Sequence, residues 1–156
     1  MNGTHAGHGT SMTVTEHHYD VSAARLFAIL VHPETYPEWL VGAKDIREVS
    51  SDWPRPGSFF KHTVGFGPIK IPDTTSARAV DGPHMLEMLV RARPLIEAVV
   101  RFEIASTGAT SCQLTMTETP AGPYKFVAPL TQPLIRARNE RSLDRLEDLV
   151  VIRPGR

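Results

Sequence analysis

Three side chains able to do acid–base or ionic chemistry, those of His62, Glu118 and Arg138, fall within segments that are otherwise apolar. Each follows the spacing of the apolar residues on one face of its segment. A buried polar group without a partner costs a few kcal/mol. These three are therefore expected to pair with one another, with water or with ligand oxygens. If His62 and Glu118 converge, one of them can act as a general base on an acidic C–H or O–H. The alternative for each is a rim position that reaches solvent, or a satisfied internal hydrogen bond.

Other residues and motifs that could take part in catalysis or metal binding do not indicate a further site. The sequence has no nucleophile elbow, no phosphate-binding loop and no dinucleotide fingerprint. The rings of His17 and His18 would point to opposite faces of a strand, which is poor geometry for one metal. Cys112 lies at an expected inward position and is predicted to be buried and inert. No cofactor and no metal are therefore predicted.

Composition limits the class of protein. The chain has 156 residues, 41% of them hydrophobic, with 17 basic and 17 acidic residues. One domain of this size can bury a core. Zero net charge argues against electrostatic binding of nucleic acid. The single cysteine fits a reducing compartment, no apolar run reaches the roughly 18 residues that cross a bilayer, and no signal pattern is present. A cytoplasmic protein without stable membrane insertion is predicted.

The elements that position these residues follow from pattern. Residues 1–11 are predicted to be a disordered tail, and Met12 is a possible start. A strand is expected over 12–19 and a helix over 23–30, which Pro33 ends. A second short helix follows, limited by Pro37. From about Asp45, six alternating segments separated by turn signals predict an antiparallel meander, and a long helix ends the chain. This order indicates an α+β fold.

Particular residues carry a family resemblance. The segment "YDVSAARLFAILVHPETYPEWLVGAKDIREV", the pair Pro56-Gly57 and the ending "NERSLDRLEDLV" are similar to the START-like (SRPBCC) superfamily. Within it the chain most resembles the family named for polyketide cyclase/dehydratase and lipid transport. The resemblance covers residues 12–152, and one departure is Val21-Ser22, where many members carry Ala-Pro. These motifs are more specific for fold than for function.

The resemblance implies a helix-grip fold: a curved antiparallel sheet of about seven strands wrapped around the long C-terminal helix. Two short helices after the first strand would close the open end of the sheet, with Tyr36 and Trp39 at the junction. Trp39 is expected either to pack in the core or to touch a ligand. A cavity would lie between the sheet and the helix. Its expected ligand-binding residues are Trp39, Phe60, His62, Met88, Val100, Phe102, Met116, Phe126, Leu130 and Leu134.

Three functions remain open from the sequence. The preferred one is binding or carriage of a small hydrophobic ligand, a lipid, polyketide or aromatic metabolite, by a monomer or homodimer. The second is a polyketide aromatase/cyclase-type enzyme with an acid/base pair, which predicts that His62, Glu118 and Arg138 meet at one void. The third is a protein-interaction module like the heat-shock ATPase activators of this fold. It predicts a filled core and an exposed apolar patch.

Overall fold

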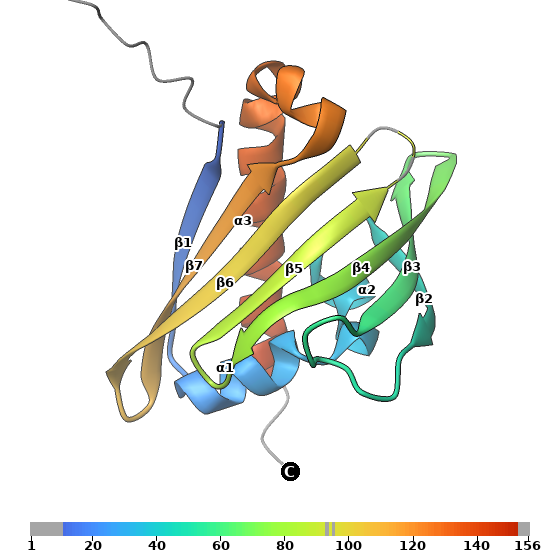
Figure 1. The fold of residues 1–156 in the computed structure, drawn as a ribbon. Helices are drawn as coiled ribbons and strands as arrows, with labels where there is room; N and C mark the ends of the chain where they lie inside the picture. Colours follow the sequence, from blue (N-terminus) through green and yellow to red (C-terminus); the bar gives the residue numbers. More distant parts are fainter. Residues whose placement is uncertain (1–10, 93, 95, 153–156) are drawn as a thin grey trace, which may run out of the picture.

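A single curved sheet wraps one face of a long helix (Figure 1). The structure, a computed structural model, describes residues 11–92, 94 and 96–152. All strand pairs are antiparallel, in the order β1-β7-β6-β5-β4-β3-β2. The elements are β1 (Thr13–Tyr19), α1 (Ala23–Leu30), η1 (Pro33–Thr35), α2 (Tyr36–Trp39), β2 (Ala43–Val49), β3 (Phe59–Phe66), β4 (Ile69–Asp81), β5 (Met85–Ala92), β6 (Ile96–Gly108), β7 (Ser111–Pro120), η2 (Gly122–Phe126) and α3 (Ala128–Ile152). The predicted α+β helix-grip fold is confirmed.

Strand alternation decides which side chains face the helix. On β6, Ala98, Val100, Phe102 and Ile104 are buried while Glu103 between them is exposed. The register carries this alternation across the sheet, because directly opposed residues share a face. The rows Met116–Phe102–Leu86 and Glu118–Val100–Met88 both run across neighbouring strands on the inner face.

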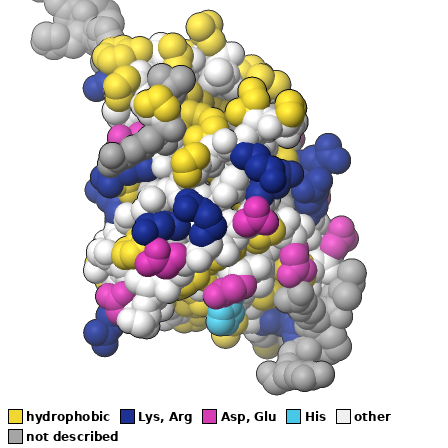
Figure 2. Space-filling view, turned by 90° about the vertical axis from the view of Figure 1, so that its right-hand side faces the viewer, with side chains coloured by type: hydrophobic (Ala, Val, Ile, Leu, Met, Phe, Trp, Pro, Cys, Tyr) yellow, Lys and Arg dark blue, Asp and Glu magenta, His cyan; other side chains and the backbone are white. Residues whose placement is uncertain are grey.

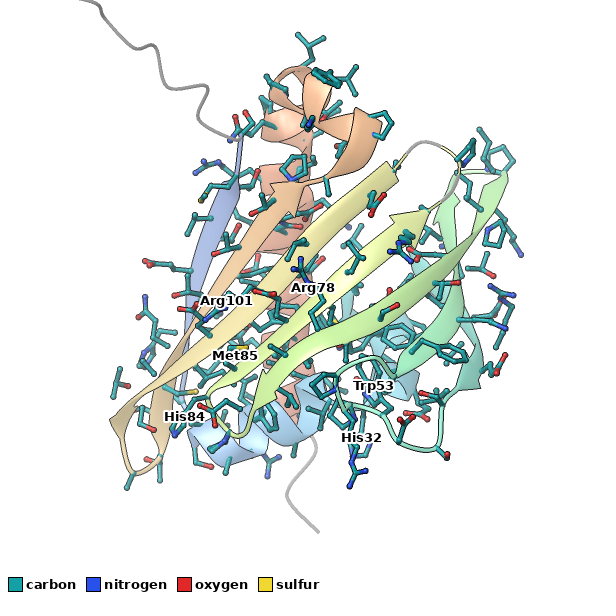
Figure 3. All side chains as sticks on the ribbon, viewed as in Figure 1. His32, Trp53, Arg78, His84, Met85 and Arg101 are labelled. Carbon is teal, nitrogen blue, oxygen red and sulfur yellow. The ribbon has the colours of Figure 1, made fainter. Side chains whose placement is uncertain are left out.

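The outer face of the sheet carries charges. Arg78 of β4 and Arg101 of β6 lie on the side of the sheet away from α3 (Figure 3). Glu87 of β5 lies between them, 3.6 Å from Arg78 Nε and 3.1 Å from Arg101 Nη1. These exposed pairs contribute little to stability and mark this face as solvated.

The core is densest where the second half of α3 meets α1 and β1. Leu143, Leu146 and Val150 are buried there. Two hydrogen bonds fix the helix in place: Tyr19 Oη donates to the Leu143 carbonyl at 2.9 Å, and Arg25 Nη2 donates to the Val150 carbonyl at 2.8 Å. Side chains fill this end of the molecule. The first half of α3 lies beyond it, in a different environment.

Aromatic side chains wedge the two short helices under the sheet. Trp39 is fully buried, with its ring edge-on to Tyr36 at 5.0 Å and to Phe102 at 6.2 Å between centroids. Phe60 extends the cluster, 5.4 Å from Tyr36 and 4.9 Å from Trp53. Edge-to-face pairs of this kind add to the stabilisation from buried area. Pro33 lies between α1 and α2, and Pro37 lies within α2. These prolines end α1 and turn α2 toward the sheet.

The predicted inward position of Phe126, Leu130 and Leu134 is wrong. Their side chains are 77%, 84% and 74% exposed. For the two leucines, which lie in α3, the reason is helical phase. Leu130 is sixteen residues before the buried Leu146 and Leu134 twelve, which at 3.6 residues per turn places them about 160° and 120° around the helix from it. The inward positions of the first half belong to Ala128, a buried residue, and to the half-buried residues that continue its row.

These three side chains, with Val127, form an exposed apolar stripe on η2 and the start of α3. Apolar side chains gather at the top of the space-filling view, above a zone of Lys, Arg, Asp and Glu (Figure 2). Among the described residues, no helix is both long and apolar enough to cross a bilayer. The predicted disordered tail, apart from Ser11, lies outside the described residues.

The phase of α3 predicts that truncating one leucine of this helix strongly lowers the stability of the protein and that truncating another hardly changes it. We expect Leu146→Ala to lower the free energy of unfolding by about 2–5 kcal/mol, because it opens a cavity in the core. We expect Leu134→Ala to change it by less than about 0.5 kcal/mol, because the side chain already contacts water. Urea denaturation followed by tryptophan fluorescence measures both. Equal losses would contradict the observed phase.

Candidate functional site

A cavity lies between the inner face of the sheet and α3. Its volume is about 90 Å³. Apolar side chains make most of the wall, and the lining residues come from α2, the segment that follows it, strands β2 to β7 and α3. The lining residues are Tyr36, Leu40, Val41, Gly42, Ala43, Phe60, His62, Val64, Asp73, Thr75, Met88, Val90, Ala92, Ile96, Ala98, Val100, Phe102, Met116, Glu118 and Arg138.

One polar group of this wall centres on His62. In β3 it is opposite Asp73 of β4, so both side chains point inward. His62 Nε2 lies 3.2 Å from Asp73 Oδ2 and 3.4 Å from Thr75 Oγ1. His62 is 3% exposed and Asp73 1%. A histidine and a carboxylate are thus held together inside the wall of the cavity.

Two atoms of this group have unused hydrogen-bonding capacity. His62 Nδ1 is buried with no hydrogen-bond partner, and so is Asp73 Oδ2, whose contact with His62 is close enough for an ion pair but lacks hydrogen-bond geometry. Asp73 Oδ1 accepts from the Arg91 backbone N–H at 3.3 Å. A buried polar atom left unsatisfied costs about 1–3 kcal/mol. The pair therefore has two buried atoms without a hydrogen-bond partner.

A second polar group is built around Glu118 of β7. Its Oε2 accepts from Arg138 Nη2 at 2.6 Å and from Asn139 Nδ2 at 3.2 Å. Arg138 also donates from Nη2 to Asn139 Oδ1 at 2.9 Å. Glu118 is 6% exposed, whereas the Arg138 side chain reaches 30%. The carboxylate is thus paired inside the cavity by a guanidinium that extends toward solvent.

The structure brings His62, Glu118 and Arg138 to one cavity, but it does not join them into one acid/base pair. His62 contacts Asp73 and Thr75, whereas Glu118 contacts Arg138 and its neighbour. In the sheet order, β6, β5 and β4 separate the strands of Glu118 and His62. In the structure His62 faces the cavity together with Phe60 and Val64, two and four positions along from Phe60 in β3.

Sequence reasoning missed Asp73, Thr75 and Asn139. A signal for the first two was present, because Asp73, Thr75 and Ala77 alternate in β4 and all three are buried. The sequence predicts this strand, but its inward residues are mostly polar, so no apolar face indicates which of its side chains point inward. Asn139 directly follows Arg138, and only the observed helix phase turns it inward.

The residues predicted to bind ligand divide into three sets. Phe60, His62, Met88, Val100, Phe102 and Met116 line the cavity. Phe126, Leu130 and Leu134 lie outside it on the exposed stripe. Trp39 lies in the core behind the wall, and Tyr36 takes the lining position instead. Of the two roles expected for Trp39, the structure thus supports packing.

Gly42 closes the wall between α2 and β2. Its φ of +98° lies in the region where a side chain is strained, so glycine suits this turn. Beside it the Val41 N–H donates to Ser142 Oγ at 3.0 Å, which joins the turn to α3. The turn thereby brings one edge of the cavity onto the helix.

Other titratable groups near the core stay neutral. Burial raises the pKa of Tyr36 well above its ordinary value, and its hydroxyl donates to the Leu30 carbonyl at 2.7 Å. Burial also raises the pKa of the Cys112 thiol, whose side chain is buried as predicted. Within the part of the chain that the structure describes, no three His, Cys, Asp or Glu side chains are grouped to hold a metal.

A family model described as polyketide cyclase/dehydrase and lipid transport matches residues 10–151. The chain belongs to this family. Its ligand-binding architecture, a curved sheet over a helix with a cavity between them, is the one observed here. No curated protein matches the sequence.

Solved structures share the fold at low sequence identity. A START superfamily protein from Mycobacterium smegmatis is 18% identical with a TM-score of 0.73, over 90% of this chain and 97% of that one. A protein from Nitrosomonas europaea is also 18% identical, with a TM-score of 0.72 over 90% and 94% of the two chains. TTHA0849 from Thermus thermophilus is 15% identical, with a TM-score of 0.70 over 91% and 98%. At such identities the likeness establishes the fold alone.

The Glu118 group predicts a stability difference between two arginines of α3. We expect Arg138→Met to lower the free energy of unfolding by about 1–3 kcal/mol, because it removes a donor from a nearly buried carboxylate. The exposed Arg136→Met is the matched control and should change little. Adding Glu118→Gln to Arg138→Met should recover part of the loss, because no charge is then left unpaired. Chemical denaturation measures each variant, and equal effects of the two arginine changes would contradict the pairing.

The raised pKa of Cys112 predicts low reactivity. Thiolate is the reactive form, and both burial and the raised pKa keep its population small at pH 8. We expect the disulfide reagent DTNB to label the protein only after unfolding by denaturant. Rapid labelling of the folded protein would show that β7 opens readily.

Proposed function

We propose that this protein binds a small apolar molecule, of one or two rings, in the cavity between the sheet and α3. The observation that supports this proposal is an apolar wall interrupted by two polar groups. Apolar walls supply most of the binding free energy for such ligands, while a few polar atoms fix their orientation. Membership of a family named for polyketide cyclases and lipid transport supports the same class of ligand.

The volume of the cavity narrows the ligand class. At about 90 Å³ it is smaller than the roughly 150 Å³ of an engineered cavity that admits benzene. A ring therefore enters only if side chains yield. Met88 and Met116 line the wall, and their unbranched thioethers adapt readily to an aromatic neighbour. A long lipid chain would need much larger displacements, so aromatic compounds are favoured over lipids.

Catalysis of the aromatase/cyclase type remains the alternative. The meeting of His62, Glu118 and Arg138 at one cavity, which that alternative required, is observed. Their separation into two polar groups removes the proposed His62–Glu118 pair as the unit of acid–base chemistry. Any proton transfer at this site would thus depend on one group alone.

A protein-interaction role is a second candidate, favoured by the exposed apolar stripe. Phe126, Val127, Leu130 and Leu134 are exposed on neighbouring turns. Clustered exposed apolar residues often mark contact surfaces. The core is not completely filled, however, so the structure combines a cavity with a patch, and the stripe can serve beside ligand binding.

Ligand binding is tested by filling the cavity. We expect the protein purified from its own host to carry a small apolar compound visible by native mass spectrometry. The compound-free protein should bind toluene and naphthalene but not palmitate, measured by ligand-observed NMR. Val90→Phe should abolish binding, because the added ring occupies the cavity that Val90 lines.

Leu89→Phe is the matched control. Leu89 is adjacent to Val90 on β5 and points to the opposite face of the sheet, so its variant should bind as the wild type does. Absence of a co-purified compound, together with no binding of any of the three compounds, would overturn the proposed function. Equal loss in both variants would indicate damage to the fold.

A further inference from the structure

We propose that the Asp73–His62 pair selects ligands with an O–H group, and that the ligand class is a small phenol whose hydroxyl donates a hydrogen bond to His62 Nδ1. This inference rests on the proposed function, because it requires a ring in the cavity. It adds the chemical group that the cavity recognises and the atom that recognises it.

The position of Asp73 decides which ring nitrogen of His62 accepts. The contact with Asp73 lacks hydrogen-bond geometry, but a carboxylate oxygen repels a ring lone pair, so its closeness favours the histidine tautomer that carries the proton on the nearer nitrogen. That nitrogen is Nε2, 3.2 Å from Asp73 Oδ2. In the neutral ring Nδ1 is then an acceptor. It is buried without a partner, so it can accept a proton donor from a ligand.

The surroundings of the pair hold it rigidly in this orientation. Phe60 packs against the imidazole at 5.2 Å between centroids. Arg47 Nη2 donates to the His62 carbonyl at 3.0 Å, and the Asp73 carboxylate is held by the backbone of β5. Thr75 Oγ1 lies 3.4 Å from Nε2 and can accept from the same N–H. The ring thus has contacts on its Nε2 side, whereas Nδ1 is buried without a partner and a ligand reaches it only when neighbouring side chains yield.

The rest of the cavity fits the ring of a phenol better than a more polar ligand. Val64, Met88, Val90 and Ala98 are among the side chains that line it. Sulfur contacts aromatic rings favourably, and the small volume excludes large substituents. Other polar side chains of the wall already have partners: Glu118 and Arg138 bond to each other, and the Tyr36 hydroxyl donates to the Leu30 carbonyl. Asp73 Oδ2 lies beside Nε2, so Nδ1 is the unpartnered acceptor left for a ligand, which corresponds to one hydroxyl on one ring.

The test compares three ligands of similar size: phenol, toluene and anisole. Affinities for the wild type are measured by ligand-observed NMR titration. We expect phenol to bind at least about tenfold more tightly than toluene, because only phenol donates a hydrogen bond to Nδ1. His62→Phe should retain toluene binding and lose this preference. The exposed His84→Phe, in the turn between β4 and β5 (Figure 3), is the matched control and should keep it.

Asp73→Asn probes the tautomer itself. The amide can donate to Nε2, which moves the ring proton to Nδ1, so the preference should shift from phenol toward anisole, an acceptor. A measurement on the unaltered protein supports these variants: ¹⁵N NMR of labelled histidine should show Nδ1 unprotonated, and phenol should move its resonance in the direction of hydrogen bonding.

The possible results separate the two proposals. Equal affinities of the wild type for phenol and toluene, or an unchanged preference in His62→Phe, would overturn the selection of O–H ligands and leave ligand binding intact. An Nδ1 resonance of a protonated nitrogen in the neutral ring would overturn it as well. Failure of all three compounds to bind would overturn both proposals.

Discussion

The packing of Tyr36 and Trp39 between the short helices and the curved sheet is the contact on which the architecture depends. A strongly curved sheet cannot contact a straight helix along its whole length. The aromatic cluster fills one end, where Trp39 and Phe60 bring α2, β3 and β6 together. Tyr36 is shared between this cluster and the cavity wall. The cavity therefore begins where aromatic side chains no longer fill the space between the sheet and α3.

Register then decides the chemistry of that cavity. His62 and Asp73 are directly opposed on β3 and β4, and Glu118 is opposite Val100 on β6. Alternate residues of a strand share a face. A shift of the register by one residue would therefore turn this buried histidine–carboxylate pair into two exposed residues. The two polar groups differ in their state. The Glu118 group has partners and a path to solvent, whereas the His62 group is sealed and has unused hydrogen-bonding capacity. This difference is the reason that we propose a recognition role for the His62 group and a structural role for the Glu118 group.

The two halves of α3 have different roles. The second half packs its leucines into the core, while the first half presents Arg138 to the cavity and leaves Leu130 and Leu134 outside. This arrangement places an exposed apolar stripe on the same helical half as the cavity wall. The cavity wall and the exposed stripe are thus adjacent on one element, and the family and the fold are compatible with both proposed roles.

The sequence by itself determined the fold class, the seven strands and the inward faces of β5 and β6, because alternation and turn signals are local properties that tertiary contacts need only preserve. It also placed His62 and Glu118 inside, since their strands have apolar neighbours at the same parity. Only the tertiary structure decided the partners of these two residues, because Asp73 and Asn139 meet them through cross-strand register and helix phase. The phase of α3 also lay beyond the sequence. Apolar residues occur on both sides of its first half, and only packing against the sheet selects which side is buried.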